Sequence, residues 1–463
     1  MKKNIQTISP IDNSVYVQRD YATQDEISRV LESAQASQKN WKATPLAERK
    51  QVCSKAVDAF IANKDAIAEE ICRQMGRPIR FAAGEVAGME ERSRAMIELA
   101  DKGLATVKLD EKEGFQRWIQ REPIGVIFVI APWNYPYLTA INAVMPAILA
   151  GNTVVLKHSA QTPLCAERLH EAFKAGGLPA GVFQYLHLSH EATETVIKDE
   201  RINHIAFTGS VPGGEMVEKA AAGRFIGIGL ELGGKDPAYI RADADLTHAV
   251  ETTMDGAFFN SGQSCCGIER IYVHESVHDD FVSQATDWVK ALKLGRSDDP
   301  ETTLGPVVRA SAADFVREQI REAISQGAIA HISADDFPED QPGSAYLAPQ
   351  LLSNVDHSMR VMTEESFGPV VGIQKVSSDQ EAIELMNDSE YGLTASIFTL
   401  DFEQGIGLGQ QVETGTFFIN RCDYLDPDLA WTGIKNSGHG CTLSVMGYES
   451  LTRPKSFHIK TDI

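Results

Sequence analysis

The segment that decides the fold reads IGVIFVIAPWNYP and spans residues 124–136. Its first seven residues form a continuous, mostly β-branched apolar run, which is typical of a strand buried on both faces of a sheet. A helix-forming stretch follows at 138–150, and a second buried strand, 153–156, comes after the break at Gly151-Asn152. Strands that alternate with helices predict a parallel sheet with right-handed crossovers.

The same alternation extends outward along the chain. Further strands are predicted at 182–186 and 204–207, and a second series begins near Ala238, with strands at 270–273, 368–374, 395–399 and 416–420. Residues 23–103 have helical periodicity instead. The flexible pair Gly233-Gly234 separates the two series, so the sequence predicts two α/β domains.

The composition is that of a soluble globular protein, for which we expect a cytoplasmic location. The 463 residues carry a formal net charge of −21, which disfavours binding to nucleic acid or to an anionic membrane surface. The seven cysteines contain no CxxC pair, which disfavours a zinc site, and free thiols indicate a reducing compartment. The N-terminus lacks the apolar stretch of a signal peptide, and no apolar run reaches the roughly 20 residues that a membrane span needs.

The strongest candidate for chemistry is NSGQSCCG, residues 260–267. A cysteine on a small, polar, glycine-flanked loop after an apolar helix is accessible and close to backbone N–H groups. Such a setting favours the thiolate, which is the nucleophilic form. Taken alone, Cys265 also fits the more common alternative, a buried and inert cysteine.

Two other residues could assist a nucleophile. Glu231, within LELGGK, is a lone acid after an apolar stretch, where burial would raise its pKa toward that of a general base. Its alternative is a turn cap or a partner for Lys235. Asn134 follows the first buried strand and could donate its side-chain N–H to an oxyanion, or it could satisfy its own turn.

Three segments suit a nucleotide. FTGS at 207–210 lies between a strand and a helix and can offer backbone donors to a phosphate, although it is not GxGxxG and is a weak signature. Lys157, at the end of a strand, could meet a ribose or phosphate, or simply be solvated. EESFGP at 364–369 places two acids beside an aromatic ring, which could bind a ribose diol or form an ordinary polar turn.

In this order and spacing, the motifs resemble those of the aldehyde dehydrogenase superfamily over essentially the full chain. The matching stretches are PWNYP (132–136), FTGS (207–210), LELGGK (230–235), NSGQSC (260–265), EESFGP (364–369) and the closing GIKNSGHG (433–440).

The resemblance implies an NAD(P)-dependent enzyme that oxidises an aldehyde to the carboxylic acid. It implies that Cys265 forms a thiohemiacetal and then a thioester, that Asn134 holds the oxyanion, and that Glu231 activates water for hydrolysis. No metal is needed. The implied cofactor contacts are Trp133, Lys157, Thr208, Gly209, Ser210, Glu365 and Phe367.

The resemblance also implies an α/β fold with two Rossmann-like domains and a small β oligomerisation ribbon. The NAD(P)-binding domain would span 1–104 and 124–232, and the catalytic domain 233–440. The ribbon would come from 105–123 and 441–463, so that a homodimer or homotetramer is expected.

Three departures from the family pattern bear on specificity. Ala160 stands where NAD-preferring relatives often have a glutamate, so we expect NADP to be accepted or preferred, with Lys157 nearby. Residues 430–433 read AWTG in place of PFGG, and Ser264 precedes the nucleophile. Arg421 could recognise a substrate carboxylate, as in a semialdehyde, or pair with Asp423 or Asp426.

Other functions remain to be weighed against this one. A CoA-acylating dehydrogenase generally lacks the base, so Glu231 argues against it. A thiol hydrolase would need a histidine partner for Cys265, and none is evident nearby in the sequence. A non-catalytic binding protein on this fold is disfavoured because Cys265, Glu231 and Asn134 are all retained. The sequence leaves open which aldehyde is used.

Overall fold

The computed structural model describes residues 4–463 and contains two separate large sheets whose strands are mostly parallel. The first has six strands in the order β19-β9-β8-β5-β6-β7, and the entirely buried β5 lies at its centre. Its parallel strands are β5 (Val126–Ala131), β6 (Thr153–His158), β7 (Phe183–Tyr185), β8 (His204–Thr208) and β9 (Gly227–Glu231).

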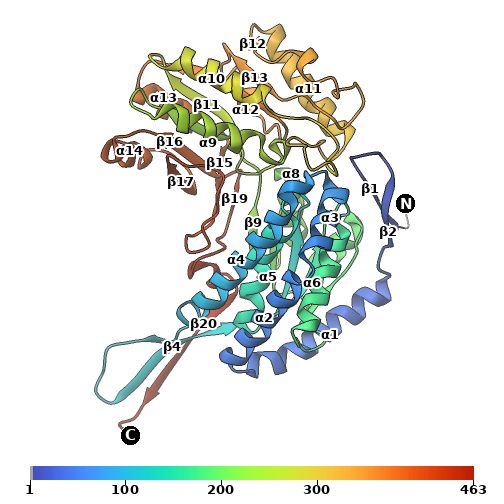
Figure 1. Cartoon of the computed structure of the whole chain (residues 1–463). Helices are drawn as coiled ribbons and strands as arrows, with labels where there is room; N and C mark the ends of the chain where they lie inside the picture. The colour runs from blue at the N-terminus through green and yellow to red at the C-terminus, as the bar shows by residue number, and fades with distance from the viewer. Residues whose placement is uncertain (1–3) are drawn as a thin grey trace.

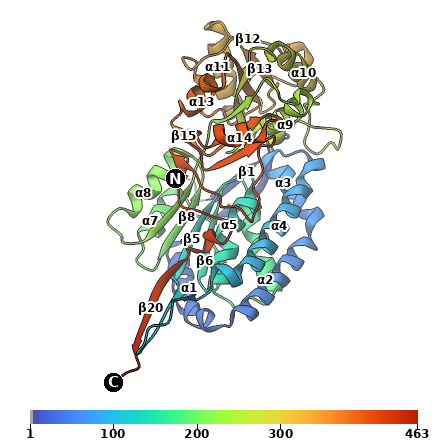
Figure 2. The same ribbon diagram turned by 90° about the vertical axis from the view of Figure 1, so that its left-hand side faces the viewer.

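Helices cover both faces of this sheet (Figures 1 and 2). The crossover helices are α5 (Pro136–Ala150), α6 (Pro163–Ala175), α7 (His190–Lys198) and α8 (Val211–Ala221). The N-terminal part adds the hairpin β1–β2 (Asn4–Ile8 and Val15–Asp20) and the helices α1 (Gln24–Ala43), α2 (Leu46–Ile61), α3 (Lys64–Met75) and α4 (Ile79–Gly103). A capping box at Thr23 begins α1, with both reciprocal hydrogen bonds present.

The second sheet has seven strands in the order β12-β13-β14-β11-β10-β16-β17 and forms the upper body in Figure 1. Its strands are β10 (Asp236–Ile240), β11 (Ile268–His274), β12 (Ile329–Ala330), β13 (Gln350–Ser353), β14 (Val370–Val376), β16 (Thr394–Phe398) and β17 (Thr416–Ile419). Its helices are α9 (Leu246–Phe258), α10 (His278–Lys290), α11 (Ala310–Ser325), α12 (Arg360–Thr363), α13 (Asp379–Asn387) and α14 (Phe402–Gly409). The pairings are parallel except β12 with β13.

A third, three-stranded ribbon projects from the lower body in Figure 1. It joins β3 (Val107–Lys108), β4 (Phe115–Pro123) and β20 (Thr452–Lys460). Trp118 and Phe457 stack across it with ring centroids 4.7 Å apart. The ribbon therefore unites the two distant segments that the sequence assigns to it.

The α/β class, with two mainly parallel sheets as expected of two Rossmann-like parts, is confirmed, and the exact domain bounds stay a prediction. The predicted boundary at Gly233-Gly234 falls between β9, which ends at Glu231, and β10, which begins at Asp236. One predicted strand is displaced: β14 begins at Val370 rather than Gly368, because Pro369 has no N–H to give a neighbouring strand.

A short strand from the predicted catalytic domain returns to the first sheet, which the sequence does not indicate. β19 (Gly438–His439) lies within the segment 233–440 but pairs with β9 in the first sheet. Just before β19, the strand β18 (Ile434–Lys435) pairs with β15 (Tyr391–Gly392) in a separate two-stranded sheet. The segment after residue 430 is thereby brought beside Glu231.

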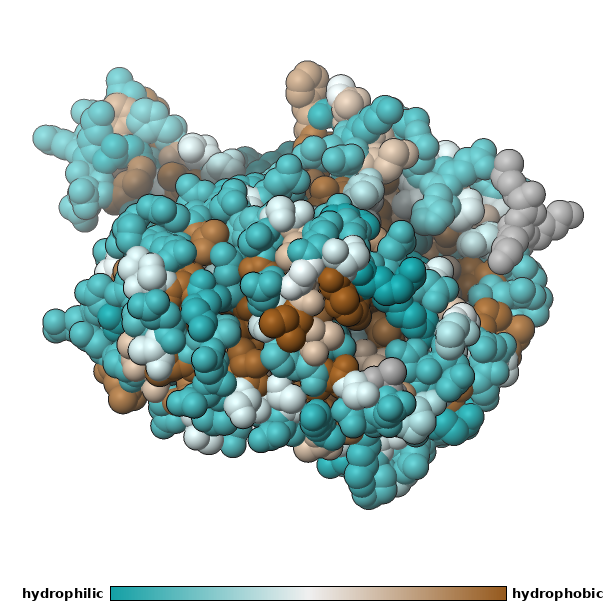
Figure 3. All heavy atoms as spheres, turned by 90° about the horizontal axis from the view of Figure 1, so that it is seen from above, coloured by the Kyte–Doolittle hydropathy of each residue, from teal (hydrophilic) through white to brown (hydrophobic). Residues whose placement is uncertain are grey.

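The surface agrees with the acidic composition. Viewed from above (Figure 3), it is mainly hydrophilic, with separate small groups of apolar residues. Among the helices of residues 4–463, none combines the length and apolar character that crossing a membrane requires.

Candidate active site

A cavity of about 890 Å³ opens at the carboxyl ends of β5, β6, β8 and β9. We call it the catalytic cavity. Ligand sites in open α/β sheets form at this edge because the crossover loops diverge there. The ten residues that the sequence singled out all line it: Trp133, Asn134, Lys157, Thr208, Gly209, Ser210, Glu231, Cys265, Glu365 and Phe367.

Cys265 is presented by a tightly held loop that follows α9. Asn260 and Ser261 adopt left-handed backbone conformations (φ 53° and 58°), which turn the chain sharply after the helix. The Gln263 side chain accepts from the Val308 N–H at 2.7 Å and donates to the Asn260 carbonyl at 3.0 Å. Within residues 260–268 only Cys265 is partly accessible, so the loop exposes one thiol to the cavity.

Asn134 is 4% exposed and faces this loop. Its Nδ2 donates to the Gln263 carbonyl at 3.2 Å, which uses one of its two amide hydrogens. The Asn134 carbonyl in turn accepts from Arg77 Nη2 at 2.7 Å and from Asn260 Nδ2 at 3.2 Å. The asparagine therefore does not cap its own turn, and a second N–H remains available in the cavity.

Glu231 ends β9 with its carboxylate held by two hydroxyl groups. Thr208 Oγ1 donates to Glu231 Oε2 at 3.2 Å, and the Thr442 hydroxyl donates to Oε1. Burial raises the pKa of Glu231, while the two hydroxyls and the charge of Arg92 partly oppose that rise.

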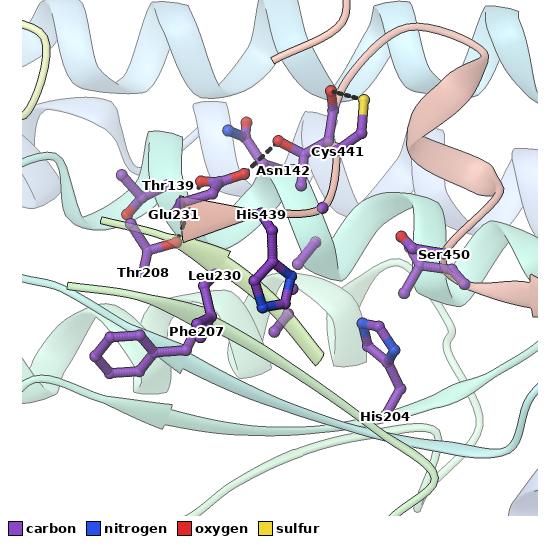
Figure 4. A pocket seen from close by; sticks show the side chains of 16 residues that line it. Thr139, Asn142, His204, Phe207, Thr208, Leu230, Glu231, His439, Cys441 and Ser450 are labelled. Carbon is purple, nitrogen blue, oxygen red and sulfur yellow. Dashed lines mark hydrogen bonds between the residues drawn. The ribbon is translucent and has the colours of Figure 1, made fainter. Parts of the chain in front are cut away.

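The carboxylate lies between two hollows. Glu231 lines the catalytic cavity and also a small cavity of about 30 Å³ behind it, the rear cavity, which Thr208, Asn142 and Cys441 share (Figure 4). The predicted alternative, a pair with Lys235, is wrong. The Lys235 ammonium is buried against Glu269 at 2.6 Å instead.

One side of the cavity carries a partly buried lysine, Lys157. Burial alone lowers the pKa of Lys157 to about 8, and in the part of the chain that the structure describes this lysine makes no ion pair. The N-terminus of α8 lies close by, with Ser210 as its cap and Gly213 on the cavity wall. Lys157 and this helix terminus both suit an anion.

Glu365 and Phe367 line the opposite side. Glu365 Oε1 accepts from the Gly234 N–H at 3.2 Å, and burial raises the pKa of Glu365 to about 8. Gly233 permits this approach, since a Cβ there would lie 2.2 Å from the Glu365 carboxylate. Phe367 meets Trp133 edge to face at 5.7 Å, whereas Glu364 points outward to Arg360.

Sequence reasoning missed six polar residues of the cavity wall. They are Ser159, His190, Glu191, Thr193, Glu194 and Arg309. Ser159 could have been found from its place two residues after Lys157. The next four lie on α7 and Arg309 directly precedes α11, and only the packing of those helices directs them to the cavity.

Arg421 lies away from the catalytic cavity. Its guanidinium sits over the Tyr424 ring at 3.7 Å, and it lines a separate hollow with Glu251, Asp255 and Asp423. The alternative prediction, an ion pair with Asp423 or Asp426, is not formed in the described residues.

Comparison with known proteins gives a consistent result. The aldehyde dehydrogenase family model matches residues 1–457. The chain is 34% identical to succinate semialdehyde dehydrogenase [NAD(P)+] Sad of Escherichia coli (strain K12) over 431 residues, which is 92% of each chain. It is 31% identical to succinate-semialdehyde dehydrogenase [NADP(+)] 1 of Mycobacterium tuberculosis (strain H37Rv), covering 98% of this chain and 99% of that one.

Solved structures agree. Succinic semialdehyde dehydrogenase from Streptococcus pyogenes, crystallised with NADP+, superposes with a TM-score of 0.93 at 32% identity and covers 98% of this chain and all of that chain. With its motifs lining one cavity and a family match across nearly every residue, the chain belongs to the aldehyde dehydrogenase family.

Proposed function

We propose that this aldehyde dehydrogenase converts an aldehyde to its carboxylic acid by covalent chemistry at Cys265, with NAD(P)+ as the oxidant. The observation that carries the proposal is the meeting of Cys265, Asn134 and Glu231 in one cavity. The Cys265 thiolate attacks the aldehyde carbon and forms a C–S bond, which leaves a thiohemiacetal oxyanion.

Asn134 is suited to hold that oxyanion. Its backbone is fixed by Arg77 and Asn260, and its Nδ2 keeps one hydrogen free beside the cysteine loop. The Cys265 backbone N–H supplies the second donor in this proposal. Donors that are fixed before the reaction stabilise developing charge without a reorganisation cost.

Glu231 releases the product. Its carboxylate takes a proton from water, the hydroxide attacks the thioester carbon, and the C–S bond breaks to give the acid and the free Cys265 thiolate. The raised pKa of Glu231 makes it a stronger base than a solvated carboxylate. This base supports hydrolysis rather than transfer of the acyl group to CoA.

The side of the cavity around Lys157 and the N-terminus of α8 fits NAD(P)+. A partly buried lysine that makes no ion pair within residues 4–463 and a helix N-terminus suit phosphate groups, and Glu365 suits the hydroxyls of a ribose. A bound NAD(P)+ supplies the hydride acceptor that turns the thiohemiacetal into a thioester. Lys157 and Ser159 line the wall, and Ala160 brings no carboxylate, which supports acceptance of NADP+.

A semialdehyde is the substrate class that the relatives favour. Two of the compared proteins are succinate semialdehyde dehydrogenases by name, and both match more than nine-tenths of this chain. We further propose that the ribbon β3-β4-β20 joins copies of the chain into a homo-oligomer, since its outer edges are unpaired in the monomer.

The first test is turnover of succinate semialdehyde and uncharged aldehydes with NAD+ and NADP+, followed by the absorbance of the reduced nicotinamide. We expect Cys265→Ala to abolish turnover while leaving NADP+ affinity unchanged. Cys72→Ala, at a free thiol on α3 that lines neither cavity, is the matched control and should stay active. A variant C265A that retains turnover would refute the covalent mechanism.

A further inference from the structure

Asp423 accepts hydrogen bonds from the residues on both sides of Cys265. The Ser264 hydroxyl donates to Asp423 Oδ1 at 3.1 Å, and the Cys266 thiol donates to the same oxygen at 2.9 Å. Both donors are buried, whereas Cys265 between them is partly accessible and lines the catalytic cavity. One carboxylate therefore holds two buried side chains while the thiol between them faces the cavity.

The two adjacent cysteines lie at the centre of a tight turn. The Gly267 N–H donates to the Ser264 carbonyl at 3.2 Å, which closes a four-residue turn around Cys265 and Cys266. This main-chain bond closes the turn but does not decide which thiol is directed to the cavity. The contacts with Asp423, which reach across 159 and 157 positions of the chain, supply that direction.

Asp423 is itself held in place from two helices. Its backbone is left-handed (φ 47°), a conformation that is uncommon outside glycine and that surrounding contacts must support. The preceding Cys422 donates its thiol to the Thr252 carbonyl on α9 at 3.3 Å. The following Tyr424 donates its hydroxyl to Glu91 on α4 at 2.9 Å. The acceptor of the two loop contacts is therefore fixed.

The same carboxylate separates the two thiols chemically. A thiol must keep its proton to donate to a carboxylate, and a thiol in its S–H form is not the nucleophile. The contact with Cys265, burial and the charge of Asp423 raise the pKa of Cys266 well above that of a free thiol. Burial raises the pKa of Asp423 to about 7, and the hydrogen bonds from Cys266 and Ser264 oppose that rise because they favour the ionised acceptor.

We propose that Asp423 is a positioning residue for the nucleophile: through Ser264 and Cys266 it turns Cys265 toward the catalytic cavity and withholds Cys266 from reaction. The inference rests on the proposed covalent chemistry and adds a residue that acts through its neighbours. In the part of the chain that the structure describes, Asp423 does not line the catalytic cavity.

The first test separates the hydrogen bonds of Asp423 from its charge. Asp423→Ala removes both bonds, and we expect kcat/KM for the aldehyde to fall about 10- to 100-fold with NADP+ affinity unchanged, because a nucleophile displaced by about 1 Å loses that much rate. Asp423→Asn should restore most of the activity, because both bonds end on Oδ1 and the amide keeps an oxygen there. Asp426→Ala is the matched control and should behave as wild type, since Asp426 is exposed and accepts from the Asp428 N–H instead.

Limited alkylation with iodoacetamide reads the two thiols without turnover. Peptide mass spectrometry should locate the label of the wild type on Cys265 and on the partly accessible Cys441, with none on Cys266. In D423A we expect Cys266 to become labelled, while the extent of labelling at Cys441, the internal reference, stays the same.

A second variant covers the case in which D423A does not fold. The double variant Ser264→Ala/Cys266→Ala removes both donors and keeps Asp423, so kcat/KM for the aldehyde should fall to a similar extent, again with NADP+ affinity unchanged.

Two results would overturn the inference. One is wild-type kcat/KM in D423A or in the double variant, with label on Cys265 but not on Cys266 wherever Cys266 is present. The other is a D423N enzyme as impaired as D423A, which would assign the effect to charge and not to position. Failure of the proposed function looks different: wild type would oxidise no aldehyde, while alkylation would still report which thiol the loop presents.

Discussion

At the scale of single residues, Asn134 shows how a flexible amide becomes a fixed donor. Three groups from distant parts of the chain hold it: Arg77, Asn260 and the Gln263 carbonyl. The amide therefore loses little freedom when it meets an oxyanion. The hydrogen bond from Asn134 Nδ2 to the Gln263 carbonyl also fixes the direction of the second amide hydrogen.

This arrangement predicts a large effect of Asn134→Ala on chemistry. We expect kcat to fall by about 10²- to 10³-fold, as for the loss of one oxyanion donor elsewhere, with NADP+ affinity unchanged. Steady-state kinetics and dinucleotide titration would measure the two quantities. If NADP+ affinity fell in parallel with kcat, the asparagine would be structural.

Glu231 predicts the pH dependence of turnover. Burial raises its pKa, and a general base works only when deprotonated, so kcat should fall as the pH is lowered through that raised pKa. In Glu231→Gln we expect kcat to drop by about 10²- to 10⁴-fold and this acid limb to disappear.

The thioester should then accumulate in the glutamine variant. Rapid mixing should show one equivalent of reduced nicotinamide per active site before turnover stalls, and intact-protein mass should show the acyl group on Cys265. Thr208→Val removes one of the two hydroxyl groups that donate to the Glu231 carboxylate. We expect this variant to raise the pKa of Glu231, so that kcat begins to fall at a higher pH than in wild type, with a smaller loss of kcat than in E231Q. A multiple-turnover E231Q enzyme would contradict the assignment.

At the scale of elements, one buried ion pair joins α4 to the start of α5. Arg77 lies between α3 and α4, and Glu85 lies on α4. Glu85 Oε1 accepts from the N–H groups of Tyr137 and Leu138 at 2.9 and 3.0 Å, which caps the first turn of α5. The pair therefore positions both the Asn134 carbonyl and the first turn of α5.

We predict that Arg77→Met lowers the free energy of unfolding by about 3–5 kcal/mol, because Glu85 is left buried without its partner. Denaturant titration would measure this loss. Arg80→Met, an exposed arginine three positions further along, should be nearly neutral. The double variant R77M/E85Q should recover part of the stability, and a variant R77M as stable as wild type would argue against the role.

At the scale of the whole molecule, the catalytic cavity exists because the chain passes between the two sheets repeatedly. Cys265 and Glu365 come from the second sheet's segment. Asn134 follows β5 of the first sheet, and Lys157 and Glu231 lie at the ends of β6 and β9. The returning β19 then places Thr442 on the carboxylate of Glu231. The ribbon β3-β4-β20 projects from the lower body (Figure 1), and none of its residues lines this cavity within residues 4–463.

Because the ribbon projects from the body of the protein, we predict that a truncation within β20 changes the oligomeric state. Removing residues 454–463 strips β20 from β4 and from the Trp118–Phe457 stack, so we expect a lower oligomer mass by light scattering. Removing only 461–463, which lie beyond β20, should leave the mass unchanged. Equal masses for both truncations would contradict an oligomerisation role for the ribbon.

The sequence by itself determined the class of fold and the members of the catalytic cavity. Buried strands such as 126–131 are visible in a local run of apolar residues. Asn134, Lys157 and Glu231 lie at or just after the ends of such strands, where the backbone alone directs them to the sheet edge. These signals need only near neighbours along the chain.

Only the tertiary structure decided how those residues are held and which others join them. The contacts of Asn134 with Gln263 and of Glu231 with Thr442 span 129 and 211 positions, and the cap that Glu85 gives α5 depends on how α4 packs against α5. Such contacts follow from the way the crossover helices pack and from the return of the chain through β19. The partners of a side chain are set by packing between elements that are distant in the sequence, and a local sequence pattern does not encode that packing.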